Sequence, residues 1–144
     1  MSNFHQLVLI NGMAASGKST FAKFCIDYAK RKYGVNGEEL STVDWVKEVA
    51  RFCGWDGKKT ELDRRFLSDL KFTLERWDGS PVTSVLDKLK KHSKDESWIS
   101  FVNCREPRNI DDFIQLNMET TGWPCVPVLV QNDRAPKITS NPAD

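Results

Sequence analysis

Residues 12–19, with the sequence GMAASGKS, fit the pattern G-x-x-x-x-G-K-[ST] without a mismatch. Glycines in such a loop let successive backbone N–H groups point inward at phosphate oxygens, and the N-terminus of a following helix adds partial positive charge. Lys18 would reach the β- and γ-phosphates of a nucleoside triphosphate, and the Ser19 hydroxyl would bind Mg²⁺. The residues that we expect to hold the nucleotide are Gly12, Ala14, Ala15, Ser16, Gly17, Lys18, Ser19 and Thr20.

This pattern is specific only where it lies between a strand and a helix. Residues 7–10 are a continuous apolar run (LVLI), which is typical of a strand buried on both faces. After Lys18, aromatic and apolar side chains recur at helical spacing, and Gly34 closes this helix as a C-cap after three basic residues. The motif therefore has the strand-to-helix context that it needs.

The rest of the chain alternates between strand-like and helix-like segments. Strands are predicted over residues 7–10, 40–43, 98–102 and 126–130. Helices are predicted over residues 18–33, 46–53, 60–77 and 80–89 and around residues 110–114. Strands separated by helices imply a parallel sheet with helices on both faces, so the fold class is α/β with a doubly wound sheet of about four strands. A length of 144 residues favours one domain over residues 1–144.

Ligands of open α/β sheets bind at the carboxyl ends of the strands. Asp44 follows the second predicted strand, where it could hold Mg²⁺ through water or orient a second substrate. A purely structural role as the N-cap of the following helix is the alternative, and both roles could coexist. We therefore expect Asp44 to be a catalytic, substrate-binding and metal-site residue.

The long helix over residues 60–77 opens with a capping-box pattern at Thr60 and Asp63. Its apolar face is predicted to carry Leu62, Phe66, Leu70, Leu74 and Trp77. Arg65 and Asp69 lie on one flank of that face, and both are expected to bind the substrate, Arg65 by clamping an acceptor phosphate in bidentate fashion. The alternative is a solvated i,i+4 ion pair between Arg65 and Asp69. Lys71 is expected to point to solvent.

Arg105 follows the third predicted strand and could neutralise charge on a migrating phosphoryl group. An ion pair with Glu106 or Asp112 is the alternative for this arginine. Trp45 and Trp55 could line the acceptor pocket, although most tryptophans serve in packing.

Two other classes of phosphate-loop protein do not fit the chain. A switch GTPase needs an N-K-x-D and a D-x-x-G sequence at strand ends, and neither is present. Larger ATPases need an aspartate that closes an apolar strand, whereas the strand over residues 98–102 is followed by Asn103, Cys104 and Arg105. A small kinase remains.

The sequence resembles the P-loop nucleotide kinases, and among them the small (deoxy)nucleoside-monophosphate-kinase-like and adenylate-kinase-like proteins. The resemblance is carried by residues 12–19, 41–48, 53–59, 63–71 and 105–107. It implies transfer of a phosphoryl group from ATP, with Mg²⁺, to a nucleoside or deoxynucleoside monophosphate. Residues 45–95 would then form the helical acceptor-binding part. Animal phosphomevalonate kinases belong to the same broad group, so another phosphorylated metabolite is an alternative acceptor.

The chain departs from this family near its C-terminus. Residues 131–144 read as a loop-like tail where such kinases have a further strand and helix, and residues 117–124 contain no arginine for a lid. A nucleotide-binding protein without efficient turnover is therefore a second hypothesis. A bare sheet edge would favour a homodimer.

Composition and charge restrict the classes of binding partner that we expect for this protein. A net charge of +1 gives no reason to expect nucleic acid. The N-terminus lacks a signal-peptide pattern, and no apolar run approaches the ~18–20 residues of a membrane span, so we expect a cytoplasmic protein without a membrane partner. The four cysteines lack C-x-x-C spacing and are expected to be buried reduced thiols, Cys25 and Cys53 on apolar helix faces.

Overall fold

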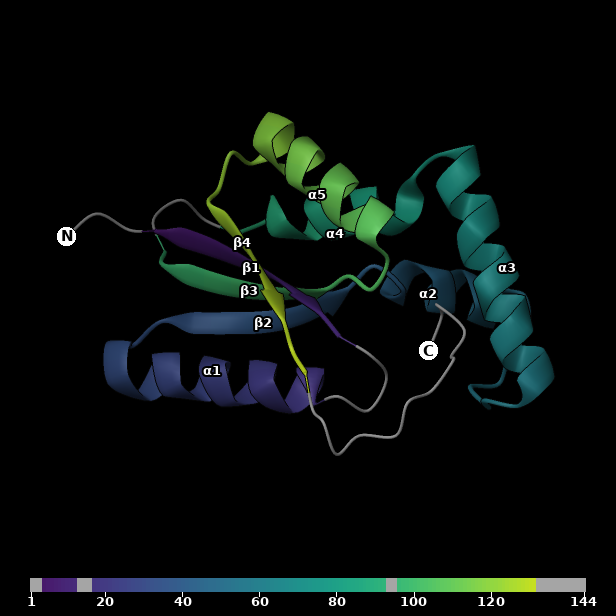
Figure 1. Ribbon diagram of the computed structural model, residues 1–144, viewed down its shortest axis with the longest axis horizontal. Helices are drawn as coiled ribbons and strands as arrows, with labels where there is room; N and C mark the ends of the chain where they lie inside the picture. Colours follow the sequence, from purple (N-terminus) through teal and green to yellow (C-terminus); the bar gives the residue numbers. More distant parts are fainter. Residues whose placement is uncertain (1–3, 13–16, 93–95, 132–144) are drawn as a thin grey trace.

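The computed structural model describes residues 4–12, 17–92 and 96–131 (Figure 1). The predicted nucleotide contacts of Ala14, Ala15 and Ser16, and the predicted tail from residue 132 onward, lie outside these residues. The described elements, in chain order, are β1 (His5–Asn11), α1 (Lys18–Tyr33), β2 (Asn36–Ser41), α2 (Asp44–Phe52), α3 (Glu61–Trp77), α4 (Ser80–Leu89), β3 (Trp98–Asn103), α5 (Pro107–Thr120) and β4 (Cys125–Leu129).

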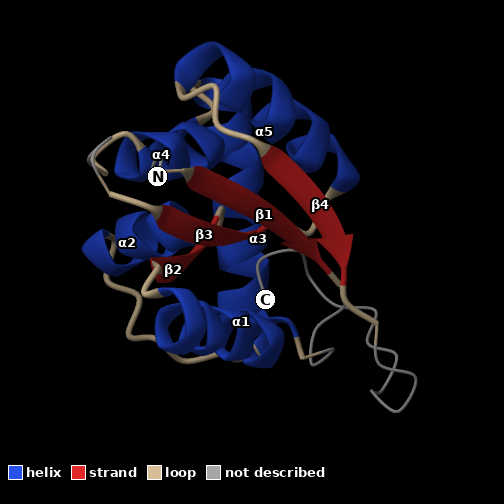
Figure 2. Ribbon diagram, turned by 90° about the vertical axis from the view of Figure 1, so that its left-hand side faces the viewer, coloured by secondary structure: helices blue, strands red, loops and turns tan. Residues whose placement is uncertain are grey.

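The strands form one parallel sheet in the order β2-β3-β1-β4. Helix α1 covers one face, and α4 and α5 cover the other (Figures 1 and 2). Helices α2 and α3 lie beyond the carboxyl ends of the strands (Figure 1). The α/β fold class with about four parallel strands is thereby confirmed. None of the helices that the structure describes has the length and apolar character needed to span a bilayer.

Strand β1 is the centre of the molecule because both of its faces are buried. Leu7 and Leu9 pack into a cluster with α4 and α5 that also contains Phe113. Ile10 packs with Ala22 of α1 on the other face. The apolar run over residues 7–10 therefore forms the strand that it predicts, directly before the phosphate loop.

Strand β2 spans Asn36–Ser41, so the predicted boundaries of residues 40–43 were wrong. Most of this strand is polar and gives no apolar signal, but it pairs with β3 from Asn36↔Trp98 to Ser41↔Asn103. Gly37 permits a close approach, because a Cβ there would lie 2.7 Å from both Cγ2 and the carbonyl oxygen of Ile99. Backbone pairing rather than side-chain burial holds this strand.

One helix start differs from the prediction. Val43 is the N-cap of α2, so Asp44 is the first helical residue and not the cap. Helix α4 begins at Ser80, as predicted, and Gly79 is its N-cap. The capping box of α3 between Thr60 and Asp63 is confirmed.

The buried face of α3 agrees only in part with the predicted one. Leu67 and Lys71 are the buried residues of this helix, whereas Leu62 and Trp77 are 74% and 82% exposed. Helix α3 packs on Val46 and Ala50 of α2 through Leu67. Leu70 and Leu74, in the middle of the predicted apolar face, also pack on this cluster, whereas both ends of that face lie in solvent.

Strand β4 lies at one edge of the described sheet. The N–H of Leu7 donates to the carbonyl of Pro124, and the N–H of Val130 donates to the carbonyl of Asn11. In a parallel ladder, alternate residues bond to the same neighbour, so the amides of residues 125, 127 and 129 point outward. Pro127 occupies the middle outward position and has no N–H to offer.

The four cysteines are all free thiols, but the prediction that they are buried was wrong for Cys53, which is exposed at the end of α2. Burial raises the pKa of Cys104 to about 12 and that of Cys125 to about 11. Burial also raises the pKa of Cys25.

We expect Cys53 to react first with a thiol reagent at pH 8, because thiolates are the reactive form and only this cysteine is exposed. Cys104 should react much more slowly, because its side chain is buried and its pKa is raised. Peptide mapping by mass spectrometry after timed alkylation measures both rates, and Cys53→Ser should remove the fast phase alone. Rapid labelling of Cys104 in the folded protein would contradict this assignment.

Candidate active site

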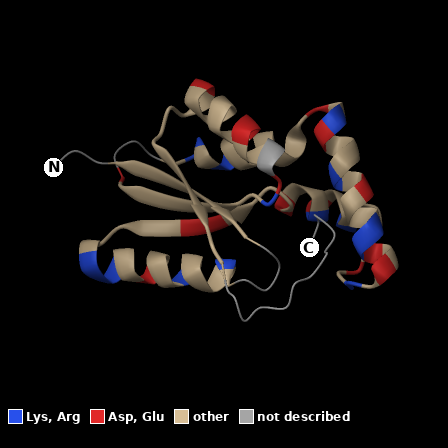
Figure 3. Ribbon diagram, viewed as in Figure 1, with Lys and Arg blue, Asp and Glu red and all other residues tan. Residues whose placement is uncertain are grey.

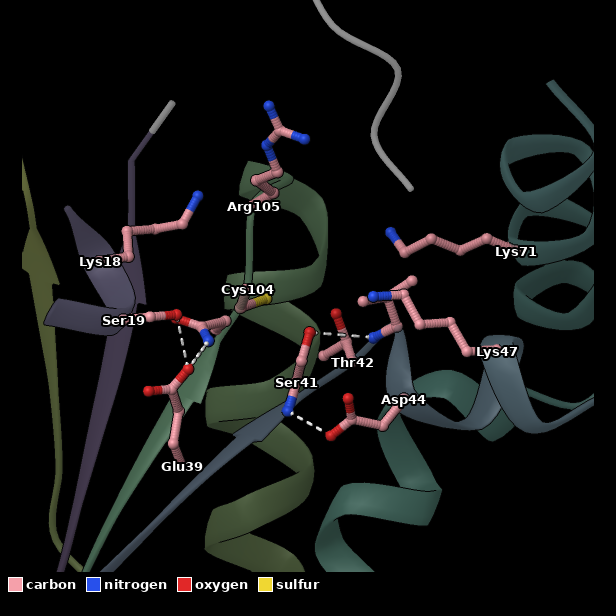
Figure 4. A pocket seen from close by; sticks show the side chains of 12 residues that line it. Lys18, Ser19, Glu39, Ser41, Thr42, Asp44, Lys47, Lys71, Cys104 and Arg105 are labelled. Carbon is pink, nitrogen blue, oxygen red and sulfur yellow. Dashed lines mark hydrogen bonds between the residues drawn. The ribbon is translucent and has the colours of Figure 1, made fainter. Parts of the chain in front are cut away.

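A cavity of about 250 Å³ opens at the carboxyl ends of β1, β2 and β3 (Figure 4). Its lining comes from the strand ends and from α1, α2 and α3. The lining residues are Lys18, Ser19, Glu39, Ser41, Thr42, Val43, Asp44, Lys47, Lys71, Asn103, Cys104 and Arg105. The position agrees with the rule that ligands of parallel sheets bind outside the carboxyl ends of the strands.

The described ends of the phosphate loop form one wall. Gly17 is the N-cap of α1 and adopts the left-handed conformation, with φ 95°. A residue with a Cβ rarely adopts this conformation. The ammonium of Lys18 donates to the carbonyl oxygen of Gly12 at 2.6 Å, so the lysine bridges the two ends of the loop. Burial, and next the charge of Arg105, lower the pKa of Lys18. An anion between these two cations would relieve their repulsion.

Ser19, Glu39 and Asn103 form a hydrogen-bonded group. Figure 4 shows Ser19 and Glu39 of this group near Lys18. The hydroxyl of Ser19 donates to Oε1 of Glu39 at 2.8 Å, and Nδ2 of Asn103 donates to the same oxygen at 3.0 Å. Oε2 of Glu39 and Oδ1 of Asn103 are buried and have no hydrogen-bond partner among the described residues. The acidic stretch of β2 that contains Glu39 stands out in an otherwise uncharged sheet (Figure 3).

This group has the oxygen ligands that Mg²⁺ requires. The described residues contain no cluster of three or more His, Cys, Asp or Glu side chains that could hold a metal ion by themselves. Mg²⁺ in nucleotide sites typically takes one or two protein oxygens and completes its shell with phosphates and water. A hydroxyl at Ser19 and a buried carboxylate oxygen without a partner at Glu39 fit that role.

Asp44 lines the cavity and also fixes the turn after β2. Its Oδ2 accepts a hydrogen bond from the N–H of Ser41 at 2.9 Å, and the hydroxyl of Ser41 accepts one from the N–H of Val43 at 3.2 Å. These bonds hold residues 41–44 in place at the start of α2. The Asp44 carboxylate is therefore oriented by the backbone, and it lines the cavity where a second substrate would lie.

Arg105 and Lys47 bring positive charge to the cavity from two different elements. The N–H of Cys104 donates to the carbonyl of Ile10 at 3.0 Å, which anchors the segment that carries Arg105 beside the phosphate loop. Lys47 lines the cavity from α2. Arg105 and Lys18 line the same cavity, and the charge of Arg105 contributes to the lowered pKa of Lys18.

Lys71 of α3 was predicted to point to solvent, and this prediction was wrong. The residue is 3% exposed, and its ammonium lies 3.1 Å from both Oε1 of Glu106 and Oδ1 of Asn109. Oε1 of Glu75 lies 3.0 Å from the same ammonium. Carboxylate partners explain how a lysine can be buried here. The lysine ties α3 to the segment that begins α5, next to Arg105.

The structure brings together only part of the predicted site. Lys18, Ser19, Asp44 and Arg105 line the cavity, whereas Arg65, Asp69, Thr20, Trp45 and Trp55 do not. Trp55 packs on the cluster between α2 and α3, and its Nε1 donates to the carbonyl of Lys58. The charged lining residues that the sequence analysis missed are Glu39, Lys47 and Lys71. No signal in the sequence pointed to Glu39, because the predicted strand began after it, at residue 40.

No protein-family model matches the sequence, and no curated protein matches it significantly. Solved structures do resemble the fold. A mutant of the APS kinase CysC from Mycobacterium tuberculosis is 14% identical, with a TM-score of 0.50 over 96% of this chain and 83% of that one. A chain of the Pnkp1/Rnl/Hen1 complex is 19% identical, with a TM-score of 0.54 over 97% of this chain and 42% of that one.

The thymidylate kinase from Ehrlichia chaffeensis is more distant, at 13% identity and a TM-score of 0.40, over 97% of this chain and 93% of that one. Identities this low speak to the fold alone. The strand order, the phosphate-loop position and the likeness to the APS kinase agree with one another. The chain has an α/β fold that resembles that of the APS kinase.

Proposed function

We propose that this protein transfers a phosphoryl group from ATP to a small phosphorylated acceptor, a nucleoside or deoxynucleoside monophosphate. The observation that carries the proposal is the arrangement of cations in the strand-end cavity. Lys18, Lys47 and Arg105 all line this one cavity. A phosphoryl group passing between two phosphorylated ligands carries the negative charge that such a set of cations would stabilise.

Phosphoryl transfer needs positioning and electrostatic stabilisation more than covalent chemistry from the protein. Lys18 would bind the β- and γ-phosphates of ATP, and Arg105 would stabilise charge on the group in transfer. Asp44, oriented by the Ser41 amide, would receive or align the acceptor. Mg²⁺, held with the phosphates near Ser19, would neutralise phosphate charge when bound.

Fewer residues support the proposed binding of the acceptor. Lys47 and Lys71 line the cavity, whereas the predicted clamp Arg65 does not. Both lysines are candidates for a contact to the acceptor phosphate, and Lys71 also holds the carboxylates of Glu75 and Glu106. The resemblance of residues 41–48 and 63–71 to nucleotide kinases favours a nucleoside monophosphate over another phosphorylated metabolite.

Coupled ADP release from Mg-ATP tests this function. The assay is run without acceptor, then with a panel of ribo- and deoxynucleoside monophosphates, and then with phosphomevalonate. We expect one nucleoside monophosphate to raise ADP release at least tenfold above the no-acceptor rate. Stimulation by phosphomevalonate alone would make the protein a kinase of another metabolite. ATP binding without stimulation by any acceptor would make it a nucleotide-binding protein without turnover.

A further inference from the structure

We propose that Glu39 of β2 supplies the carboxylate of the Mg²⁺ site, a role that Asp44 was expected to fill. This inference rests on the proposed binding of Mg-ATP and names the side chain that serves the metal. In P-loop nucleotide hydrolases the metal is held by the loop Ser or Thr together with an aspartate that closes a strand. Here the strand next to β1 ends in Asn103, whose amide carries no charge.

The register of the sheet explains how a residue on β2 can take that place. Ser41 is opposite Asn103 and Glu39 is opposite Phe101, so these four residues project on one face. Phe101 packs with Ala22 of α1, which identifies the face as the one that α1 covers. The Glu39 side chain therefore extends across β3 toward the start of α1, where Ser19 lies.

The hydrogen bonds hold Glu39 in the orientation that the role requires. Oε1 accepts from both Ser19 and Asn103, so the asparagine at the β3 end orients the carboxylate instead of supplying it. Oε2 is buried, with no hydrogen-bond partner among the residues described here. A buried carboxylate oxygen without a partner is unfavourable, and a cation or its bound water would satisfy it.

Asp44 is less suited to this metal than Glu39 is. Its Oδ2 is engaged by the Ser41 amide in the turn before α2, and none of its hydrogen bonds reaches the Ser19 hydroxyl. The division of labour that follows is a metal carboxylate on β2 and an acceptor-side carboxylate on α2. Each acid then lies beside the ligand that it serves.

Manganese binding separates these assignments without relying on turnover. Mn²⁺ replaces Mg²⁺, a non-hydrolysable ATP analogue replaces ATP, and electron paramagnetic resonance measures the free metal. We expect Glu39→Gln to weaken Mn²⁺ binding to the protein–analogue complex about tenfold or more. Affinity for the analogue in EDTA should stay within about twofold. Glu39→Gln combined with Asn103→Asp should recover most of the metal affinity, because the carboxylate returns on β3.

Glu38→Gln is the matched control, because Glu38 is the next residue of β2 and bonds His92 instead. It should leave Mn²⁺ affinity unchanged. Wild-type affinity in Glu39→Gln, or a loss in Asp44→Asn alone, would overturn the assignment while nucleotide binding stands. If the wild-type protein binds no analogue with or without metal, the proposed function itself fails. Circular dichroism of each variant confirms that the fold is retained.

Discussion

Replacing Lys18 by alanine is expected to lower the rate of ATP-dependent phosphoryl transfer by about a thousandfold, the scale on which single charged groups act in this chemistry. The Lys18 ammonium already bridges to the Gly12 carbonyl and lines the strand-end cavity. Removing it takes away both the charge on the β- and γ-phosphates and the bridge across the loop. ADP release with the best acceptor measures the loss.

Lys23→Ala is the control, because Lys23 is an exposed lysine on the same helix. It should retain wild-type turnover. Substantial turnover in Lys18→Ala would contradict the assigned role of this residue. A weaker loss in Lys18→Arg than in Lys18→Ala is expected, because the charge is kept while its position changes.

The lowered pKa of Lys18 determines the direction in which nucleotide affinity changes with pH. Only the protonated lysine attracts phosphate, so affinity falls as the pH rises toward the pKa of Lys18. Since burial and Arg105 place this pKa below that of an ordinary lysine, the fall should begin at a lower pH than for an exposed lysine. Lys18→Arg should remove that fall, because a guanidinium stays protonated.

The second large effect is on stability. Lys71→Met is expected to lower the free energy of unfolding by about 3–5 kcal/mol, because it leaves the carboxylates of Glu75 and Glu106 near each other without their shared cation. Their side chains are largely buried, so water cannot fully replace the lysine. Urea denaturation followed by circular dichroism measures the change.

Two further variants separate loss of charge balance from loss of packing. The triple variant Lys71→Met, Glu75→Gln and Glu106→Gln should recover most of the stability, since an apolar or neutral group can replace a buried ion pair at little cost. Lys23→Met, on the exposed surface of α1, should change it by less than about 0.5 kcal/mol. Equal stability of Lys71→Met and the wild type would contradict the buried network.

The fold was predictable where burial leaves a mark on the sequence. Residues 7–10 are apolar on both faces because helices cover both, and the loop that follows is sharply patterned. Strand β2 was misplaced because its residues 36–39 are Asn-Gly-Glu-Glu, which satisfy the backbone pairing of an edge strand without an apolar stripe. The buried face of α3 depends on where α2 lies, and local periodicity does not contain that information.

The candidate site likewise contains residues that the sequence predicted and residues that it did not. Lys18, Ser19, Asp44 and Arg105 follow strands or form the loop, so the topology alone brings them together. Glu39 and Lys71 come from within a strand and within a helix, where a charged residue normally reads as solvent-exposed. Their roles depend on partners distant in sequence, Ser19 for one and Glu106 for the other. Such pairings become visible only in three dimensions.

Because Pro127 has no backbone N–H, the β4 edge is poorly suited to pairing with another copy of the chain at high concentration. A strand added to the β4 edge by another copy would find donors at Cys125 and Leu129 but none between them. Growth of one sheet through many copies depends on an unbroken row of such donors. We therefore expect Pro127 to disfavour the growth of a continuous sheet through many copies of the chain. The homodimer stays a prediction, and we expect its two copies to associate through side-chain packing rather than through a shared sheet.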